Sequence, residues 1–142
     1  MPDGAQGVVT TDVGAELLEE VARTFGRVRV LVRGGSMLPA IRPGDVLEVV
    51  PIDILRVSVG DVILFRWEER LLAHRVIRLI DEDEPLVITR GDRHTHDDPP
   101  VHASQIIGLV SRVVRPDATM RRLVAAARYV AGVARGFPFS TT

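Results

Sequence analysis

The sequence predicts a mainly β fold, with a core of antiparallel sheets flanked by an N-terminal and a C-terminal helix. Short segments in which apolar and polar residues alternate occupy the middle of the chain, which is the pattern of half-buried strands. Gly-Asp pairs, which favour tight turns, recur between these segments at 44–45, 60–61 and 91–92. Apolar residues at helical spacing occur instead near the two ends of the chain.

The N-terminal helix is expected to follow Thr11 and Asp12, which are suitable capping residues. Gly26 is expected to end it. The apolar residues at helical spacing between these limits are Leu17, Leu18, Val21 and Phe25.

The core strands follow this helix. They are expected at 28–33, 46–50, 62–67, 71–80, 86–90 and 106–114. In the first of them, Val28, Val30 and Val32 share one apolar face. The segment 91–104, dense in His, Asp and Pro, is expected to be a loop.

The C-terminal helix is expected from Asp117 to about Arg135. Its mixture of arginine and apolar residues suits packing on the sheet. The same mixture also suits an anionic membrane surface or a partner protein, so peripheral membrane contact stays open.

The composition describes an ordinary globular protein. The chain has 142 residues, 46% hydrophobic and 26% charged, which fits one domain with a modest core. A formal net charge of −1 gives no indication of a nucleic acid partner. The absence of cysteine excludes disulfides, thiol catalysis and cysteine metal sites.

The chain contains no lysine: its 18 Lys and Arg positions are all arginine. Arginine cannot lose its proton near neutral pH. A mechanism with lysine as the general base is therefore excluded.

No apolar run approaches the roughly 20 residues that span a bilayer. Residues 1–10 lack the basic start of a secretory signal. We therefore expect a cytoplasmic or peripheral membrane location.

Ser36 is the candidate nucleophile, because a serine directly after Gly34 and Gly35 can present its hydroxyl at a tight turn. Backbone N–H groups in such a turn can face a developing oxyanion, and Pro39 stiffens the exit. The alternative is a plain Gly-Ser turn in which Met37 fills the core.

His74 is the candidate general base, since a nucleophilic serine needs a base and histidine has a suitable pKa. It is expected in the middle of a strand, on one face with Leu72 and Val76. The alternative is a hydrogen-bonded core histidine without a catalytic role.

Asp92, Asp97 and Asp98 are three candidate partners for His74 in the loop that follows Arg90. One of them can accept the Nδ1–H of the imidazole and fix its tautomer. The alternative is that they are only turn or cap residues.

Three histidines near the same loop also raise a metal alternative. They are His94, His96 and His102, which with a carboxylate would make a possible ligand set. The pattern is weak, and we predict no metal and no cofactor.

Taken together in this order, these segments resemble the S26 signal peptidases. The segment GGSMLPAIRPGDVLEV is similar to the serine box of that family, and VGDVILF to the next box. AHRVI resembles the histidine box of the endoplasmic-reticulum and archaeal subgroup, and ITRGDRHTHDDPP resembles the box that ends in an aspartate. The resemblance covers roughly 28–114 and implies a signal peptidase/LexA-like core.

The resemblance implies catalytic roles for matched residues. Ser36 matches the nucleophile, His74 the base and Asp98 the orienting aspartate, with Asp92 as a supporting carboxylate. Gly35, Met37 and Pro39 match the residues that position the serine and the oxyanion.

The chain departs from the family pattern at three points. We expect no N-terminal membrane anchor, Arg93 and His94 replace paired asparagines, and Gly34 stands where a serine is frequent. We therefore expect a small form without an anchor, divided into a flexible N-terminus at 1–10, a catalytic domain at 11–116 and a C-terminal helix and tail at 117–142.

The function implied is a serine endopeptidase that binds a peptide as an extended strand and cleaves a signal or leader peptide after small residues. One alternative is a catalytically silent peptide-binding module on the same fold. Another is a LexA-like self-cleaving regulator. Such regulators use lysine as base and carry a DNA-binding domain, for which about 30 residues before the serine box are too few.

Overall fold

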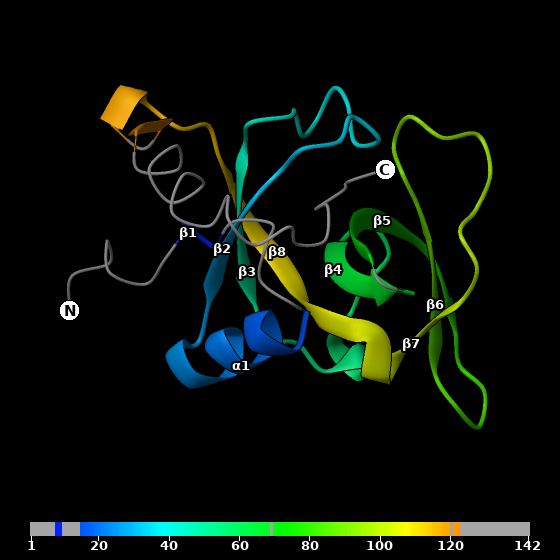
Figure 1. The fold of residues 1–142 in the computed structure, drawn as a ribbon. Helices are drawn as coiled ribbons and strands as arrows, with labels where there is room; N and C mark the ends of the chain where they lie inside the picture. Colours follow the sequence, from blue (N-terminus) through cyan, green and yellow to red (C-terminus); the bar gives the residue numbers. More distant parts are fainter. Residues whose placement is uncertain (1–7, 10–14, 69, 120, 123–142) are drawn as a thin grey trace.

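The sheet determines the shape of the molecule. A computed structural model of the chain describes residues 8–9, 15–68, 70–119 and 121–122. These form one eight-stranded sheet in the order β1-β2-β3-β8-β4-β5-β6-β7 (Figure 1). The strands are β1 (Val8–Val9), β2 (Val28–Leu31), β3 (Val46–Val50), β4 (Val62–Trp67), β5 (Arg70–Ile80), β6 (Leu86–Arg90), β7 (Val101–His102) and β8 (Ile106–Val114). Within these ranges β1 pairs parallel with β2, and the other pairings are antiparallel.

The six predicted strands are confirmed, and so is the mainly β fold with antiparallel pairing. The sequence did not predict β1, β7 or two short 3₁₀ turns at Ile54–Arg56 and Ala103–Gln105. A strand of two residues is too short to show alternation, so β7 was wrongly included in the loop 91–104. Val101 of β7 pairs with Val87 of β6, which makes β7 the edge strand on this side of the sheet.

The helix α1 (Ala15–Phe25) confirms the predicted N-terminal helix, which ends at Gly26 with a positive φ of 78°. Its predicted apolar stripe is only partly correct. Leu18 is fully buried, but Leu17 and Phe25 are 55% and 51% exposed. Leu17 is exposed because it lies about 100° around the helix from Leu18, and Phe25 is the last residue of the helix. The predicted caps at positions 11 and 12 lie outside the described residues.

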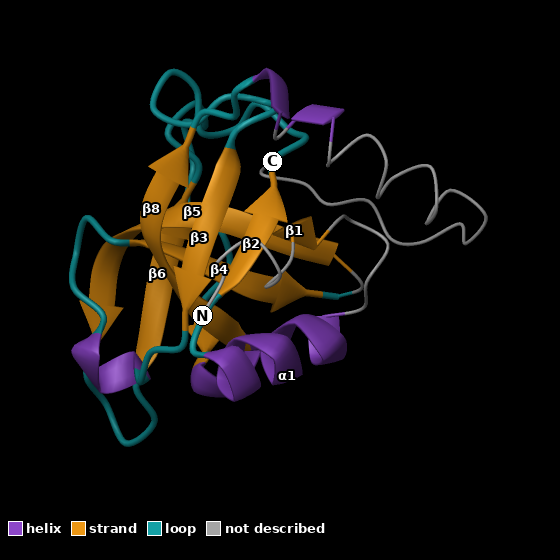
Figure 2. Cartoon of the chain, turned by 90° about the vertical axis from the view of Figure 1, so that its left-hand side faces the viewer, coloured by secondary structure: helices purple, strands orange, loops and turns teal. Residues whose placement is uncertain are grey.

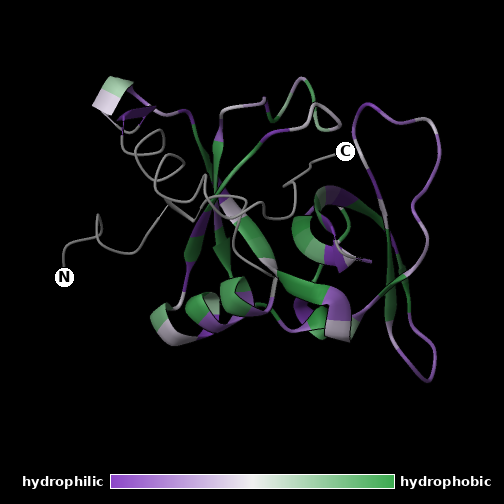
Figure 3. Cartoon of the chain, in the orientation of Figure 1, coloured by the Kyte–Doolittle hydropathy of each residue, from purple (hydrophilic) through white to green (hydrophobic). Residues whose placement is uncertain are grey.

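The core occupies both faces of the sheet. Alternate side chains of β4 enter different clusters: Leu64 packs with α1, β2 and β3, whereas Ile63 and Phe65 pack with β5 and β6. Burying each such side chain stabilises the fold by roughly 1.5–3 kcal/mol. Figure 3 shows the apolar strands between a polar hairpin tip and the mixed surface of α1.

The loops that carry the candidate site lie together at one end of the sheet. The segment between β2 and β3 and the segment after β6 are on the opposite side from α1 (Figure 1). Figure 2 shows α1 across the other end of the central strands. The site is therefore built on loops that leave a rigid sheet.

The start of the predicted C-terminal helix is described. The pairs 118–119 and 121–122 are helical, and the Arg121 N–H donates to the Asp117 carbonyl at 3.0 Å. The prediction for residues 123–142, including packing or membrane contact, lies outside the described residues. In the part of the chain that is described, no helix combines the length and apolarity needed to cross a membrane.

Candidate active site

His74 is fixed by the sheet. It lies in the middle of β5, opposite Ile63 of β4, and is fully buried. The Phe65 ring meets the imidazole edge-on, with ring centroids 6.1 Å apart. The strand and its neighbours therefore leave the ring little freedom to turn.

Ser36 lies in a turn that follows β2. The Gly35 carbonyl accepts the Leu38 N–H at 3.2 Å, and the Met37 carbonyl accepts the Ile41 N–H at 3.0 Å. These bonds place the Ser36 Oγ 3.1 Å from the Nε2 of His74, which is hydrogen-bond distance.

Asp98 completes the line of contacts. Its Oδ2 lies 2.5 Å from the Nδ1 of His74 and accepts the Thr89 hydroxyl at 2.8 Å. The Asp98 N–H donates to the Thr89 carbonyl at 2.8 Å, so the loop returns to β6 at this point. Of the three candidate aspartates, Asp98 is the one that bonds His74.

The electrostatics of Asp98 favour its charged form. Partial burial raises the pKa of this carboxyl. Hydrogen bonds from His74 and Thr89, with the charge interactions of His74 and His94, outweigh burial, and the net pKa is lowered. A charged Asp98 can accept a hydrogen bond from the Nδ1–H of His74. The Nδ1–H tautomer of the ring would leave the Nε2 lone pair facing Ser36, as a general base requires.

Gly91 allows the loop to approach the serine turn. A Cβ at this position would lie 3.0 Å from the Ser36 carbonyl oxygen and 3.2 Å from the His74 Nε2. The backbone then continues to Arg93, whose N–H donates to the same Ser36 carbonyl at 2.8 Å. A side chain at position 91 would therefore crowd both the serine turn and the imidazole.

The other two candidate aspartates contact arginines. Asp92 forms a two-pronged pair with Arg75, at 2.8 and 2.9 Å, and its N–H donates to the Met37 sulfur at 3.4 Å. Asp97 lies 3.5 Å from Arg90. Asp92 thus attaches the loop to Arg75, the residue that follows His74 on β5. Its contact with Met37 links the loop to the serine turn.

The three predicted positioning residues all lie in that turn. Met37 is fully buried. Pro39 follows a cis peptide bond from Leu38. Gly35 is bordered by Leu38, whose Cδ1 would lie 3.2 Å from an added Cβ. Their contribution to an oxyanion site stays a prediction.

His94 lies beside His74, a position that the sequence did not predict. Its ring meets His74 edge-on at 5.4 Å between centroids and stacks on His96 at 5.9 Å. His102 instead pairs with Glu84 at 2.7 Å. The suggested metal group of His94, His96 and His102 is therefore not assembled. The signal that could have found His94 was its position where the family pattern has asparagine.

Comparison with known proteins identifies relatives of one kind. The chain is 36% identical over 84 residues to the signal peptidase complex catalytic subunit SEC11 of Zygosaccharomyces rouxii, a match covering 56% of this chain and 50% of that protein. The SEC11 subunits of Ogataea parapolymorpha and Lachancea thermotolerans are 34% and 35% identical, covering 52% and 56% of this chain and 49% and 50% of theirs. This chain is related to the S26 signal peptidases.

The relationship to the signal peptidases confirms the resemblance drawn from the boxes. The chain spans about half the length of the curated SEC11 relatives it matches. No family model matches the chain.

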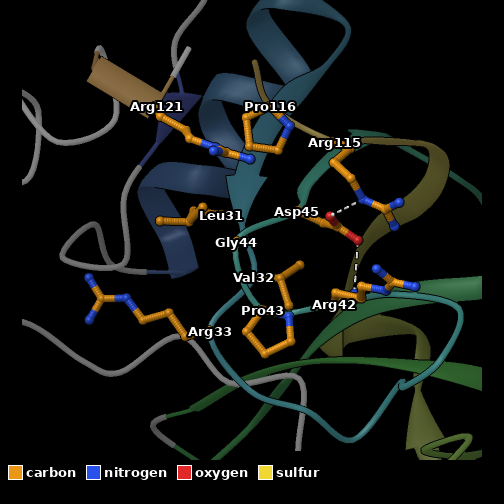
Figure 4. Close-up of a pocket in the computed structure, with 10 residues that line it drawn as sticks. All are labelled: Leu31, Val32, Arg33, Arg42, Pro43, Gly44, Asp45, Arg115, Pro116 and Arg121. Carbon is orange, nitrogen blue, oxygen red and sulfur yellow. Dashed lines mark hydrogen bonds and ion pairs between the residues drawn. The ribbon is translucent and has the colours of Figure 1, made fainter. Parts of the chain in front are cut away.

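A separate pocket of about 690 Å³ adjoins the serine turn of this signal peptidase relative (Figure 4). Its walls include Arg42 and the buried Asp45, and neither Ser36, His74 nor Asp98 lines it. Asp45 accepts the Arg42 N–H at 2.8 Å and lies 3.4 Å from the Nε of Arg115. These contacts brace the exit of the turn, and the hydroxyl and imidazole lie outside the pocket.

Proposed function

We propose that this chain is a serine endopeptidase of the signal peptidase type, which cleaves a signal or leader peptide after small residues. The observation that carries the proposal is the continuous line of contacts from Ser36 Oγ through His74 to Asp98. The relationship to proteins named as signal peptidase catalytic subunits supports the same chemistry.

In the first step, His74 Nε2 removes the proton of Ser36 Oγ as the oxygen attacks a peptide carbonyl. Asp98 stabilises the imidazolium that forms. The imidazolium then gives its proton to the leaving amine, and an ester of Ser36 remains. Water, deprotonated by His74, hydrolyses this ester and regenerates the serine.

The peptide is proposed to lie extended along a strand edge, where backbone hydrogen bonds align the scissile carbonyl with Ser36. The Ser36 N–H is the proposed oxyanion donor. A donor of this kind contributes about 3–4 kcal/mol to transition-state stabilisation.

The test is cleavage of a peptide with small residues one and three positions before the cut, followed by mass spectrometry. Ser36→Ala and His74→Ala should each lower the rate by several orders of magnitude with an unchanged circular dichroism spectrum. Ser111→Ala is the matched control, because its exposed hydroxyl bonds only the Glu48 carbonyl among its described contacts. Cleavage by Ser36→Ala at the wild-type rate would refute the mechanism.

A catalytically silent peptide-binding module is the second candidate. The low exposure of the nucleophile favours it, because Ser36 is only 4% exposed and His74 is fully buried. A serine-directed acylating probe separates the two. An enzyme should be labelled at Ser36 and lose labelling in His74→Ala, whereas a silent module should bind the peptide without being labelled.

A further inference from the structure

The Nδ1 of His94 is buried and has no hydrogen-bond partner among the described residues. An unpaired buried nitrogen is unfavourable, so a group that pairs with it would stabilise this arrangement. The ring belongs to the loop that crosses Ser36 and meets His74 edge-on. Its Nδ1 lies beside Gly91, close to the Ser36 carbonyl.

The Nε2 of His74, which contacts the Ser36 hydroxyl at 3.1 Å, lies close to the same point. Measured from the place where a Cβ of Gly91 would sit, His94 Nδ1 lies 3.0 Å away and His74 Nε2 lies 3.2 Å away. Two imidazole nitrogens, together with the Ser36 carbonyl oxygen at 3.0 Å, therefore lie close to one point beside Gly91. One ligand atom each from His74, His94 and Asp98 lie within 4.8 Å of one another.

Asp98 fixes the orientation of the His74 ring. The carboxylate holds the Nδ1 of the ring at 2.5 Å, and Thr89 holds the carboxylate in turn. A carboxylate on the far nitrogen of a metal-bound histidine fixes the tautomer and raises the basicity of the ligating nitrogen. Since Asp98 Oδ2 already accepts two hydrogen bonds, its contribution is through His74.

We propose that His74 Nε2 and His94 Nδ1 together bind a zinc ion, and that this ion inhibits the site. Neutral imidazole nitrogens suit zinc and similar transition metals, whereas magnesium and calcium prefer oxygen ligands. Zinc binds imidazole nitrogen at about 2.0–2.1 Å and accepts water in its remaining positions. The Ser36 hydroxyl, 3.1 Å from His74 Nε2, borders the position of the ion.

Inhibition follows from the atom that the ion occupies. The lone pair of His74 Nε2 that binds zinc is the one that takes the proton of Ser36 in the proposed mechanism. This consequence depends on the proposed peptidase function, but zinc binding itself does not. The two can therefore be tested separately.

The binding test is a calorimetric titration of zinc into the untagged full chain without peptide. His94→Ala should weaken binding at least tenfold, and Asp98→Asn should weaken it by about 10–100-fold through His74. His96→Ala and His102→Ala are matched controls from the same region, and each should bind within about twofold of wild type. Cobalt in place of zinc should give the visible absorption of a four-coordinate site in wild type and not in His94→Ala.

Two results would overturn the proposal: no zinc binding by the wild-type chain, or equal affinity in wild type and His94→Ala. If peptide cleavage is observed, the zinc concentration for half-inhibition should rise at least tenfold in His94→Ala and stay unchanged in His96→Ala. If calorimetry shows the site but the wild-type chain cleaves no peptide, the peptidase proposal fails while the zinc site stands.

Discussion

Thr89 donates its hydroxyl hydrogen to the same Asp98 oxygen that contacts the Nδ1 of His74, at 2.8 Å. Thr89 is fully buried on β6, next to the strand that carries His74. The sheet therefore fixes the carboxylate from one side and the imidazole from the other. The loop that carries Asp98 is therefore attached to β6 through the same carboxylate that contacts His74.

Thr89→Val tests this anchoring role, since valine keeps the shape and removes the hydroxyl. Losing one of the two bonds to Asp98 should lower kcat about 3–30-fold, with little change in KM, because orientation of His74 and not peptide binding is affected. Stability should fall by about 1 kcal/mol, measured by urea denaturation. The control is Thr24→Val, whose hydroxyl makes an exposed contact with Glu20 at 3.4 Å. A fall in kcat as large in Thr24→Val as in Thr89→Val would contradict the role.

The lowered pKa of Asp98 predicts how stability changes in acid. A carboxyl with a lower pKa in the folded state stabilises the protein fully above its unfolded pKa, and this contribution is lost as the pH falls through the folded pKa. The difference in unfolding free energy between wild type and Asp98→Asn should therefore be constant near neutral pH and shrink in acid.

The control for that pH dependence is Asp97→Asn. Its carboxyl is 47% exposed and lies 3.5 Å from Arg90, so its removal should leave the pH profile of stability nearly unchanged. Equal acid profiles for Asp98→Asn and wild type would show that Asp98 has no such linkage.

The strands were predictable because side-chain alternation is a local property. That His74 shares a face with Leu72 follows from the same period of two, whereas its burial depends on the strands that cover β5. The choice among Asp92, Asp97 and Asp98 was not predictable from the residues alone, because it depends on how the loop crosses Ser36 and returns to Thr89. The family resemblance favoured Asp98, which is the carboxylate that contacts His74.

His94 and β7 escaped prediction for related reasons. The direction of a loop histidine is set by long-range contacts, here the backbone bond of Arg93 to Ser36, and not by local spacing. The two residues of β7 show no period, although their pairing with β6 fixes the end of the loop. Sequence patterns thus identified the groups that could act, and the fold determined which of them meet.

Gly91→Ala tests whether the site tolerates a side chain at position 91. The added methyl would lie 3.0 Å from the Ser36 carbonyl and 3.2 Å from the His74 Nε2, so one of these groups must move. Overpacking of this kind costs roughly 1–3 kcal/mol. Cleavage should fall, because even a small shift of the Ser36 turn or of the imidazole disturbs the alignment of the reacting groups.

Gly35→Ala is the control for Gly91→Ala, because it adds the same methyl group where the neighbouring atom can move more easily. Its methyl would meet the end of the flexible Leu38 side chain at 3.2 Å, which can move without displacing backbone. Its loss of stability should therefore be the smaller of the two in thermal denaturation. The interpretation fails if Gly91→Ala retains wild-type activity and stability.

Asp92→Asn separates bracing of the loop from orientation of the base. The pair with Arg75 raises the pKa of the arginine chiefly through its hydrogen bond, although partial burial opposes this effect. The Arg75 side chain is 35% exposed, so solvent screens the pair and its loss should cost no more than about 1 kcal/mol. Cleavage by Asp92→Asn should fall less than tenfold, whereas Asp98→Asn should lose about 10⁴-fold through the wrong tautomer of His74. Equal losses in the two variants, measured as kcat at one pH, would mean that Asp92 contributes to orientation as directly as Asp98.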